Sequence, residues 1–180
     1  MKISSNELIS VLHAEKPAAD RVDKLQLYAG FIGDWDAQII THAPDGARHE
    51  GSGEIHFGWI LEGRAIQDVW MIPRLAERPN VPPLPVAGNW FGTTIRVYDS
   101  KIDAWRIYWI DPATNSFCQQ IGRQRGHDIV QEGKSESDAL SRWSFTKITP
   151  SSFHWLGESS ASGDNSWRLV VEVLARRKAA

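Results

Sequence analysis

The sequence predicts an all-β protein: an antiparallel up-and-down β-barrel of eight to ten strands, preceded by short helices. From residue 33 onward, apolar residues recur with period two, as in strands that bury one face. About ten such stretches are separated mostly by hairpin-length turns containing Gly, Pro, Asn or Asp. A meander this long must close on itself or leave two long edges exposed, so closure into a barrel is favoured.

The segment ahead of the barrel is expected to be helical. The Ser4–Glu7 spacing is that of a capping box, which predicts a short helix ending before Pro17. A second helix is expected to begin at Asp20, because apolar residues then share one face. Residues 1–30 are therefore interpreted as a helical segment and residues 31–180 as a single barrel domain.

Ten strands follow, and turn residues separate most of them. The predicted strands are residues 35–41, 55–60, 64–72, 91–98, 105–110, 117–123, 129–132, 140–147, 153–156 and 167–175. One connection is long: Pro73–Trp90 holds five of the nine prolines. A connection of this length in a compact domain is usually functional, so it is expected to cover one mouth of the barrel or to contact a second subunit.

Tryptophan is the strongest departure from ordinary composition, with nine in 180 residues. If the more apolar phase of each strand faces inward, eight indoles point into the barrel, and only Trp90, in the long connection, does not. The same rule places Ile95 and Gln119 inward. The indoles expected inside are Trp35, Trp59, Trp70, Trp105, Trp109, Trp143, Trp155 and Trp167.

Hairpin registers test these phases. A two-residue turn at Glu62-Gly63 and a three-residue loop at Pro112–Thr114 both pair inward residues with inward residues. The resulting pairs are Trp59 with Ile66, Phe57 with Asp68, Ile55 with Trp70, Trp109 with Phe117 and Ile107 with Gln119. A two-residue turn at Asp45-Gly46 instead sets Trp35 against the outward His56, which predicts a phase-resetting bulge within Gly51–Gly53.

The few polar groups on the inward face are candidate site residues. Arg64 and Asp68 lie four residues apart on one strand, beside Trp70. A barrel of about ten strands is wider than side chains fill easily, so a cavity for a small apolar or aromatic molecule is favoured. The residues expected to bind that molecule are Trp59, Asp68, Trp70, Ile95, Trp105, Trp109, Gln119, Trp143 and Trp155.

Two functions remain open for this cavity. In the first, the protein binds a flat or apolar molecule that Asp68 and Arg64 orient. In the second, it is a cofactor-independent isomerase or cyclase, with Asp68 as general acid or base and Arg64 stabilising negative charge. A purely structural interpretation competes with both: Arg64 reaches solvent from the strand start, and Asp68 is a satisfied buried acid that fixes the barrel's register.

Composition and motifs argue against several other classes. A net charge of −2 without long runs of one sign disfavours nucleic acid or membrane as a partner. The single cysteine, Cys118, forms no intrachain disulfide, and without a secretory signal a cytoplasmic location is expected. Common phosphate, dinucleotide, hydrolase and zinc-cysteine motifs are missing, so no cofactor or metal is expected. A haem or metal site would have to use His49 or His127 near the rims.

Several segments resemble a known family. GDWDA, around Trp35, resembles the Gly-x-Trp that begins the first strand of calycins (lipocalins and their relatives), where the tryptophan packs across the barrel floor. From about Leu27 to Arg177, the order and spacing of several blocks are similar to those of a bacterial family of lipocalin-like proteins of unknown function. The blocks are LEGRAIQDVWMIPR, GTTIRVYDSKIDAWRIYWIDP, IVQEG, RWSFTKITPSSFHW and WRLVVEVLARR. The resemblance implies a calycin-type barrel in a cytosolic bacterial protein and brings no substrate, cofactor or catalytic residue.

The sequence departs from one related group. Trp35 is followed by Asp36-Ala37-Gln38, so the Gly-x-Trp-x-Gly-x-Gly pattern and histidine-dependent haem site of nitrobindin-like barrels are not matched.

An outer patch bears on assembly. Phase assignment puts aromatic and apolar residues outside, next to arginines, and such a patch favours a homodimer over a monomer. The residues expected in this patch are Arg96, Tyr98, Arg106, Tyr108 and Ile110.

Overall fold

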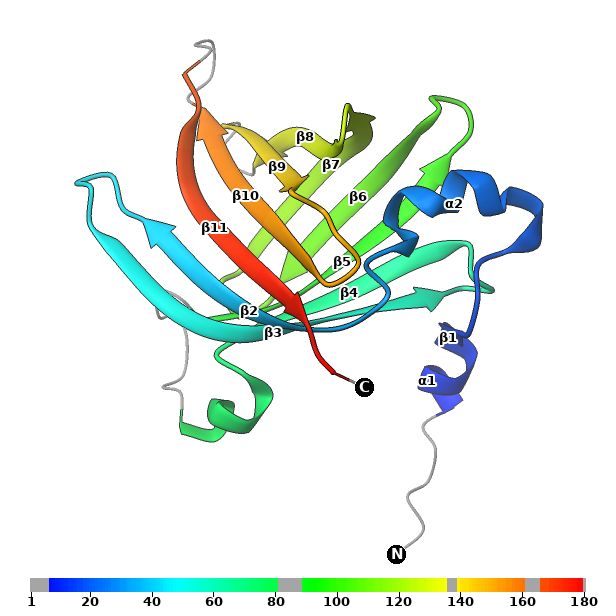
Figure 1. Ribbon diagram of the computed structural model, residues 1–180, viewed down its shortest axis with the longest axis horizontal. Coiled ribbons are helices and arrows are strands. Elements are labelled where there is room, and N and C mark those ends of the chain that lie inside the picture. The colour runs from blue at the N-terminus through cyan, green and yellow to red at the C-terminus, as the bar shows by residue number, and fades with distance from the viewer. Residues whose placement is uncertain (1–6, 81–88, 136–138, 161–165, 180) are drawn as a thin grey trace, which may run out of the picture.

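Ten antiparallel strands close into a barrel in the computed structural model, which describes residues 7–80, 89–135, 139–160 and 166–179. Each strand pairs with its neighbours in the chain, and β2 also pairs with β11, so the barrel has no free edge along these ten strands (Figure 1). The strands are β2 (Gly33–His42), β3 (Arg48–Ile60), β4 (Ala65–Ile72), β5 (Trp90–Asp99), β6 (Ala104–Asp111), β7 (Ser116–Arg125), β8 (Asp128–Ser135), β9 (Leu140–Thr146), β10 (Ser152–Ser160) and β11 (Arg168–Arg177). The predicted fold class and all ten predicted strands are confirmed.

The N-terminal segment closes one end of the barrel. After α1 (Glu7–Leu12), the two-residue strand β1 (His13–Ala14) pairs with the end of β3. A 3-10 turn, η1 (Ala19–Arg21), then leads into α2 (Val22–Ala29), which buries Leu25 and Tyr28. Figure 1 shows α2 lying across the end of the barrel beside β5 and β6. The expected second helix is therefore present, and the Ser4 cap of the first lies outside the described residues.

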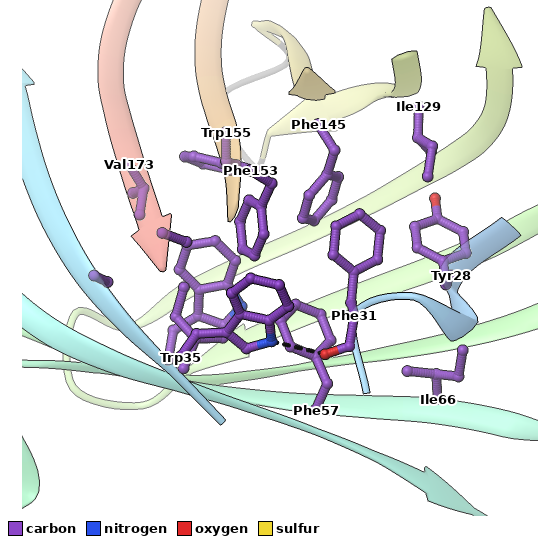
Figure 2. Close-up of a cluster of buried hydrophobic side chains, with 14 of the residues drawn as sticks. Tyr28, Phe31, Trp35, Phe57, Ile66, Ile129, Phe145, Phe153, Trp155 and Val173 are labelled. Atoms are coloured by element: carbon purple, nitrogen blue, oxygen red, sulfur yellow. Dashed lines mark hydrogen bonds between the residues drawn. The ribbon is translucent and has the colours of Figure 1, made fainter. Parts of the chain in front are cut away.

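Beneath α2 lies an aromatic cluster that we call the floor. Phe31 is its centre, with ring centroids 4.6 Å from Phe145, 5.2 Å from Phe153 and 5.6 Å from Phe57 (Figure 2). The Trp35 indole donates a hydrogen bond of 2.7 Å to the Phe31 carbonyl. This places the tryptophan of the GDWDA segment across the barrel floor, as the resemblance implied.

Arg177, near the end of β11, also binds the floor region. The Arg177 guanidinium lies 4.2 Å from the centroid of the Trp35 ring and donates hydrogen bonds to the carbonyls of Gly30, Ile32 and Pro150. Gly33 makes room for this contact: its φ is +122°, and a Cβ there would lie 2.7 Å from the Arg177 guanidinium. The last strand therefore holds the first strand and the segment that precedes it.

The first long hairpin differs from the prediction. Trp35 pairs with Ile55, both inward, and the register is continuous from Gly33 to His42. A longer loop produces this register: Ala43 N donates to Ala47 O across three intervening residues, and Gly46 occupies the positive-φ position at +87°. The predicted bulge within Gly51–Gly53 is therefore wrong, because one added loop residue restores the phase.

On strands β5 and β7, the residues that point inward are the ones predicted to point outward, and the reverse. Asp99 pairs with Ala104, which sets Arg96 opposite Ile107 and turns Ile95 to the outer wall. The β6–β7 loop has four residues, not three, so Gln120 pairs with Ile107 and Gln119 is exposed. A one-residue error in a loop moves every side chain of the strand to the other face. The β3–β4 pairs predicted from the Glu62-Gly63 turn are confirmed.

Trp167 is not among the inward indoles. Between Gly157 and Glu158 the β10–β11 register shifts, so Val171 and Leu169 pair with consecutive residues of β10 and the residue between them is extra. This bulge reverses the phase of the chain before it. The Trp167 ring is accordingly stacked by Arg142 at 4.1 Å, on the face where Arg142 also binds Glu158.

The expected outer patch is only partly present. Arg96 is buried in the barrel, and the Tyr98 ring packs on Trp105 at 6.1 Å, so neither belongs to the patch. Tyr108 and Ile110 are exposed as expected, and Phe117, which was expected inside, joins them. The homodimer stays a prediction.

The long connection between β4 and β5 begins on the outer wall. Arg74 donates to Asp36 at 2.5 Å, and the N–H of Leu75, the first residue of η2 (Leu75–Asn80), donates to Glu54 at 2.9 Å. Residues 81–88 lie outside the described residues, so covering of a mouth stays a prediction.

Candidate ligand-binding cavity

A cavity of about 170 Å³ lies inside the barrel, toward the end away from α2. Five tryptophans from five strands line it, together with short polar side chains and one residue of each charge. The lining residues are Trp70, Trp90, Thr94, Arg96, Trp109, Asp111, Thr114, Ser116, Trp143, Trp155 and Val171. The cavity is therefore an aromatic chamber with a few polar groups, the usual make-up of a small-molecule site.

Four of the indoles form a continuous arc. The Trp109 and Trp143 centroids are 6.0 Å apart and nearly perpendicular, and Trp143 and Trp155 are 5.7 Å apart. Trp70 completes the arc at 5.2 Å from Trp155. These are favourable tilted and edge-to-face contacts, so the rings hold one another in place without a ligand.

A missing side chain shapes the wall between β4 and β6. Gly92 of β5 pairs with Trp70, and a Cβ on Gly92 would lie 2.5 Å from the Trp109 ring and 2.9 Å from Asp111 Cβ. Only a glycine lets the Trp109 indole lie against the strand here. Trp70 and Asp111 consequently flank Gly92, two strand spacings or roughly 10 Å apart at the backbone.

Two buried polar atoms at this wall lack a hydrogen-bond partner among the described residues: Trp70 Nε1 and Asp111 Oδ2. Trp70 is 4% exposed and Asp111 is 1% exposed. The other Asp111 oxygen, Oδ1, accepts hydrogen bonds from the backbone N–H groups of Ala113, at 2.8 Å, and Thr114, at 3.3 Å. Leaving such groups unpaired costs about 1–3 kcal/mol each, so two residues of the cavity lining hold one unused donor and one unused acceptor.

A buried ion pair lies beneath the cavity. Arg96 Nη1 donates to Asp68 Oδ2, and Thr94 N donates to Asp68 Oδ1 at 3.0 Å. Both charged side chains are almost completely buried, and the guanidinium carbon lies 5.2 Å from the Tyr28 ring centroid and 5.7 Å from that of Phe57. Both Asp68 oxygens are thus occupied, and Asp68 does not line the cavity.

A chain of side-chain amides extends from this ion pair across the barrel. Gln131 Oε1 accepts from Arg96 Nε at 3.2 Å and from the Tyr28 hydroxyl at 3.0 Å. Gln131 in turn donates to Gln120 at 3.5 Å, and Gln120 donates to Ser141 at 3.0 Å. Burial raises the pKa of Tyr28 far above its usual value, so its hydroxyl stays protonated as a donor. The polar layer separates the cavity from the floor.

The structure brings together four of the predicted ligand-binding residues and moves others away. Trp70, Trp109, Trp143 and Trp155 line the cavity. Trp59 and Trp105 are buried inward, in the hydrophobic core outside the cavity lining. The predictions that placed Ile95 and Gln119 inside are wrong, because the phases of β5 and β7 are reversed.

Arg64 is also displaced from its predicted position. It precedes β4, its side chain is 42% exposed, and it binds Asp20 at 2.9 Å. The expected Arg64–Asp68 partnership is therefore replaced by Arg96–Asp68. The enzymatic hypothesis required Asp68 and Arg64 in one site, and this geometry does not bring them together.

Sequence reasoning missed Trp90, Thr94, Arg96 and Asp111. The first three share the inward phase of β5, which was hidden because Ile95 and its neighbours make the outer phase more apolar. A signal was available in the pairing of Tyr98 with Trp105, which follows from a four-residue turn after Asp99. Asp111 lies between the predicted strand 105–110 and the predicted loop Pro112–Thr114, so it had no predicted place inside the barrel.

Two other candidate chemistries can be placed. Cys118 lies beside Ser141 at 3.4 Å, and burial raises the pKa of its thiol, which disfavours the reactive thiolate. Among the described residues no group of three or more His, Cys, Asp or Glu is arranged to hold a metal ion. In the same part of the chain, no helix has the length and apolar character needed to cross a membrane.

The closed ten-strand barrel with its interior cavity defines a lipocalin-like, calycin-type fold. Two solved structures share it. Rv2717c from M. tuberculosis is 12% identical, with a TM-score of 0.58 over 91% of this chain and 100% of that one. The S-type phycobiliprotein lyase CPES from Guillardia theta is 10% identical, with a TM-score of 0.57 over 91% and 99% of the two chains. No family model and no curated protein matches the chain.

Proposed function

We propose that the protein binds a small aromatic molecule in the tryptophan-lined cavity. The observation that carries the proposal is the lining: five indoles line one cavity inside the barrel, and two buried polar atoms of its lining residues have no partner among the described residues. Indole faces supply dispersion and shape, and a few polar groups fix the orientation of a ligand.

The volume limits the size of the molecule. About 170 Å³ is close to the volume of a dry protein cavity, about 150 Å³, that accepts benzene. Typical sites for larger ligands are about 300–1,000 Å³. The proposed ligand is therefore a single ring with one or two further heavy atoms.

The test uses benzyl alcohol as a neutral single-ring probe and isothermal titration calorimetry as the readout. The wild-type protein is expected to bind it with one site and a negative heat-capacity change, because apolar surface is buried. Ser116→Trp, which fills the cavity from its lining, is expected to remove binding.

The matched control is Ser100→Trp, the same change on the exposed β5–β6 hairpin at the other end of the barrel. It is expected to leave binding unchanged. The proposal fails if benzyl alcohol does not bind at millimolar concentration, or if it binds Ser116→Trp as well as it binds the wild type.

A further inference from the structure

The lining of the cavity is electrostatically unbalanced. It contains two ionisable side chains, Arg96 and Asp111. Arg96 already has a buried counter-charge in Asp68, with which it forms an ion pair beneath the cavity. Asp111 has no such counter-charge: its described partners are two backbone N–H groups, both on Oδ1. The cavity therefore offers one negative group that nothing in the described part of the protein neutralises.

The unpartnered Asp111 oxygen belongs to a residue of the cavity lining. Asp111 is 1% exposed and lines the cavity, and Oδ2 has no partner among the described residues. A buried carboxylate without a compensating donor is costly, and a charged donor compensates it better than a neutral one. A ligand that places a protonated nitrogen at Oδ2 would remove this cost.

The indoles around Asp111 suit the same charge. Trp109 lies two residues before Asp111 on β6, and its ring packs against Trp143 and against the open position at Gly92. Tryptophan presents the most favourable ring face for a cation, and cages of aromatic side chains are a recurrent way to hold organic ammonium groups. An anion would meet both the carboxylate and the negative faces of the rings.

The second unpaired atom has the opposite character. Trp70 Nε1 is a donor, and in the sheet the residue Trp70 lies across Gly92 from Asp111. A ligand with an acceptor atom on the side away from its ammonium group would satisfy this donor as well. The two atoms together describe a polarised molecule with its positive end at Asp111.

We infer that the natural ligand is a small organic cation, a single-ring amine protonated at neutral pH, whose N–H donates to Asp111 Oδ2 within the tryptophan cage. The inference rests on the proposed function, since it names the ligand class of that same cavity. Asp111 selects the ligand by the charge of its ammonium group, and the indoles select it by shape.

The experiment compares three probes of nearly equal size in calorimetric titrations at neutral pH: benzylammonium, benzyl alcohol and benzoate. Benzylammonium is expected to bind about tenfold more tightly than benzyl alcohol, the effect of one desolvated cation–carboxylate and cation–π contact. Benzoate is expected to bind weakest. This ranking is measured on the unmodified protein and does not depend on the folding of any variant.

The variant Asp111→Asn keeps an oxygen for the backbone bonds of the turn and removes the charge. It is expected to bring the affinity for benzylammonium down to that for benzyl alcohol and to leave the affinity for benzyl alcohol within about twofold. The control is Asp45→Asn, because Asp45 accepts the Ala47 N–H at 2.9 Å in a comparable exposed turn of the β2–β3 hairpin. This control should preserve the wild-type ranking.

Two results separate this inference from the proposed function. If benzyl alcohol binds and benzylammonium gains nothing, or if its advantage survives in Asp111→Asn, the cation inference is overturned while the cavity proposal stands. If benzyl alcohol does not bind, or if benzyl alcohol and benzylammonium bind Ser116→Trp as well as they bind the wild type, both proposals are overturned.

Discussion

The two halves of the barrel interior are both rich in aromatic residues. They differ in how closely the side chains pack and in whether the buried polar atoms have hydrogen-bond partners. In the floor, the Trp35 indole N–H donates to the Phe31 carbonyl, and Phe31 has an aromatic ring on three sides. In the cavity, the Trp70 N–H has no partner among the described residues, and about 170 Å³ is left between the rings. A filled, hydrogen-bonded interior favours stability, and an unfilled one with unpaired polar atoms favours binding. The polar layer of Asp68, Arg96 and Gln131 separates the two.

The largest effect is expected at the floor. Phe31→Ala should lower the free energy of unfolding by about 3–5 kcal/mol, because the ring is almost completely buried among other rings. Urea denaturation measures it. The matched control, Phe117→Ala, removes the same ring from the outer wall, where it is 43% exposed, and should cost under about 1 kcal/mol. Equal losses would contradict both the floor and the assigned phase of β7.

The next effect is expected at the polar layer. Asp68→Asn leaves the buried Arg96 guanidinium without its counter-charge and should lower the free energy of unfolding by about 3 kcal/mol. Binding of benzyl alcohol should stay within about twofold, because Asp68 does not line the cavity. A folded variant that had lost binding would instead give Asp68 a direct role in the ligand site.

A third experiment compares one substitution in both halves. Trp35→Phe leaves the Phe31 carbonyl without its donor and should cost about 2 kcal/mol. Trp70→Phe removes a buried N–H that had no described partner and should change the free energy of unfolding by less than about 1 kcal/mol. Urea melts of the two variants measure the contrast, and a larger loss for Trp70→Phe would contradict it.

The smallest effect is expected on the outer wall, in the dependence of the free energy of unfolding on pH. It serves as a comparison for the effects in the two interior regions. Burial acts to raise the pKa of Glu172, but hydrogen bonds from His42 and His154 outweigh it, and the pKa is lowered from 4.5. A lowered pKa in the folded state means that this stabilisation is present above pH 4.5 and lost as the pH falls through the folded value.

In Glu172→Gln, the free energy of unfolding should therefore fall less steeply than in the wild type as the pH is lowered below 4.5, with a difference of under about 1 kcal/mol. Urea denaturation across this pH range measures the slope. Asp45→Asn, at an exposed acid whose described hydrogen bond is to a backbone N–H, serves as the control and should keep the wild-type slope. An unchanged slope in Glu172→Gln would contradict the prediction.

The sequence predicted the barrel because its strongest signals are local. The two-residue turn at Glu62-Gly63 sets the β3–β4 register unambiguously, and period-two patterning located all ten strands. The apolar phase was a reliable guide where the outer wall is mainly polar, as on β9 and β10. Eight indoles were expected inside, and seven of them are found there with Trp167 the exception.

The polar half of the site was hidden for a physical reason. On β5 the outer phase carries Ile95 and Val97 while the inner phase carries Arg96, so hydrophobicity alone selects the wrong face. The pair Arg96–Asp68 is a contact between neighbouring strands joined by the longest connection between the ten barrel strands, and no turn rule fixes that register. Asp111 serves a turn with one oxygen and the cavity with the other, and the sequence displays only the first role.

The pairing of β2 with β11 has a consequence for synthesis. β2 needs two partners, β3 and β11, and the second is made more than a hundred residues after β2. Until β11 is available, β2 therefore lacks one of its two partners, and the Trp35 ring lacks the Arg177 guanidinium that stacks on it. Contacts this distant in sequence fold slowly and expose aggregation-prone edges. We expect ribosome-bound chains that lack β11 to engage chaperones and full-length chains to release them.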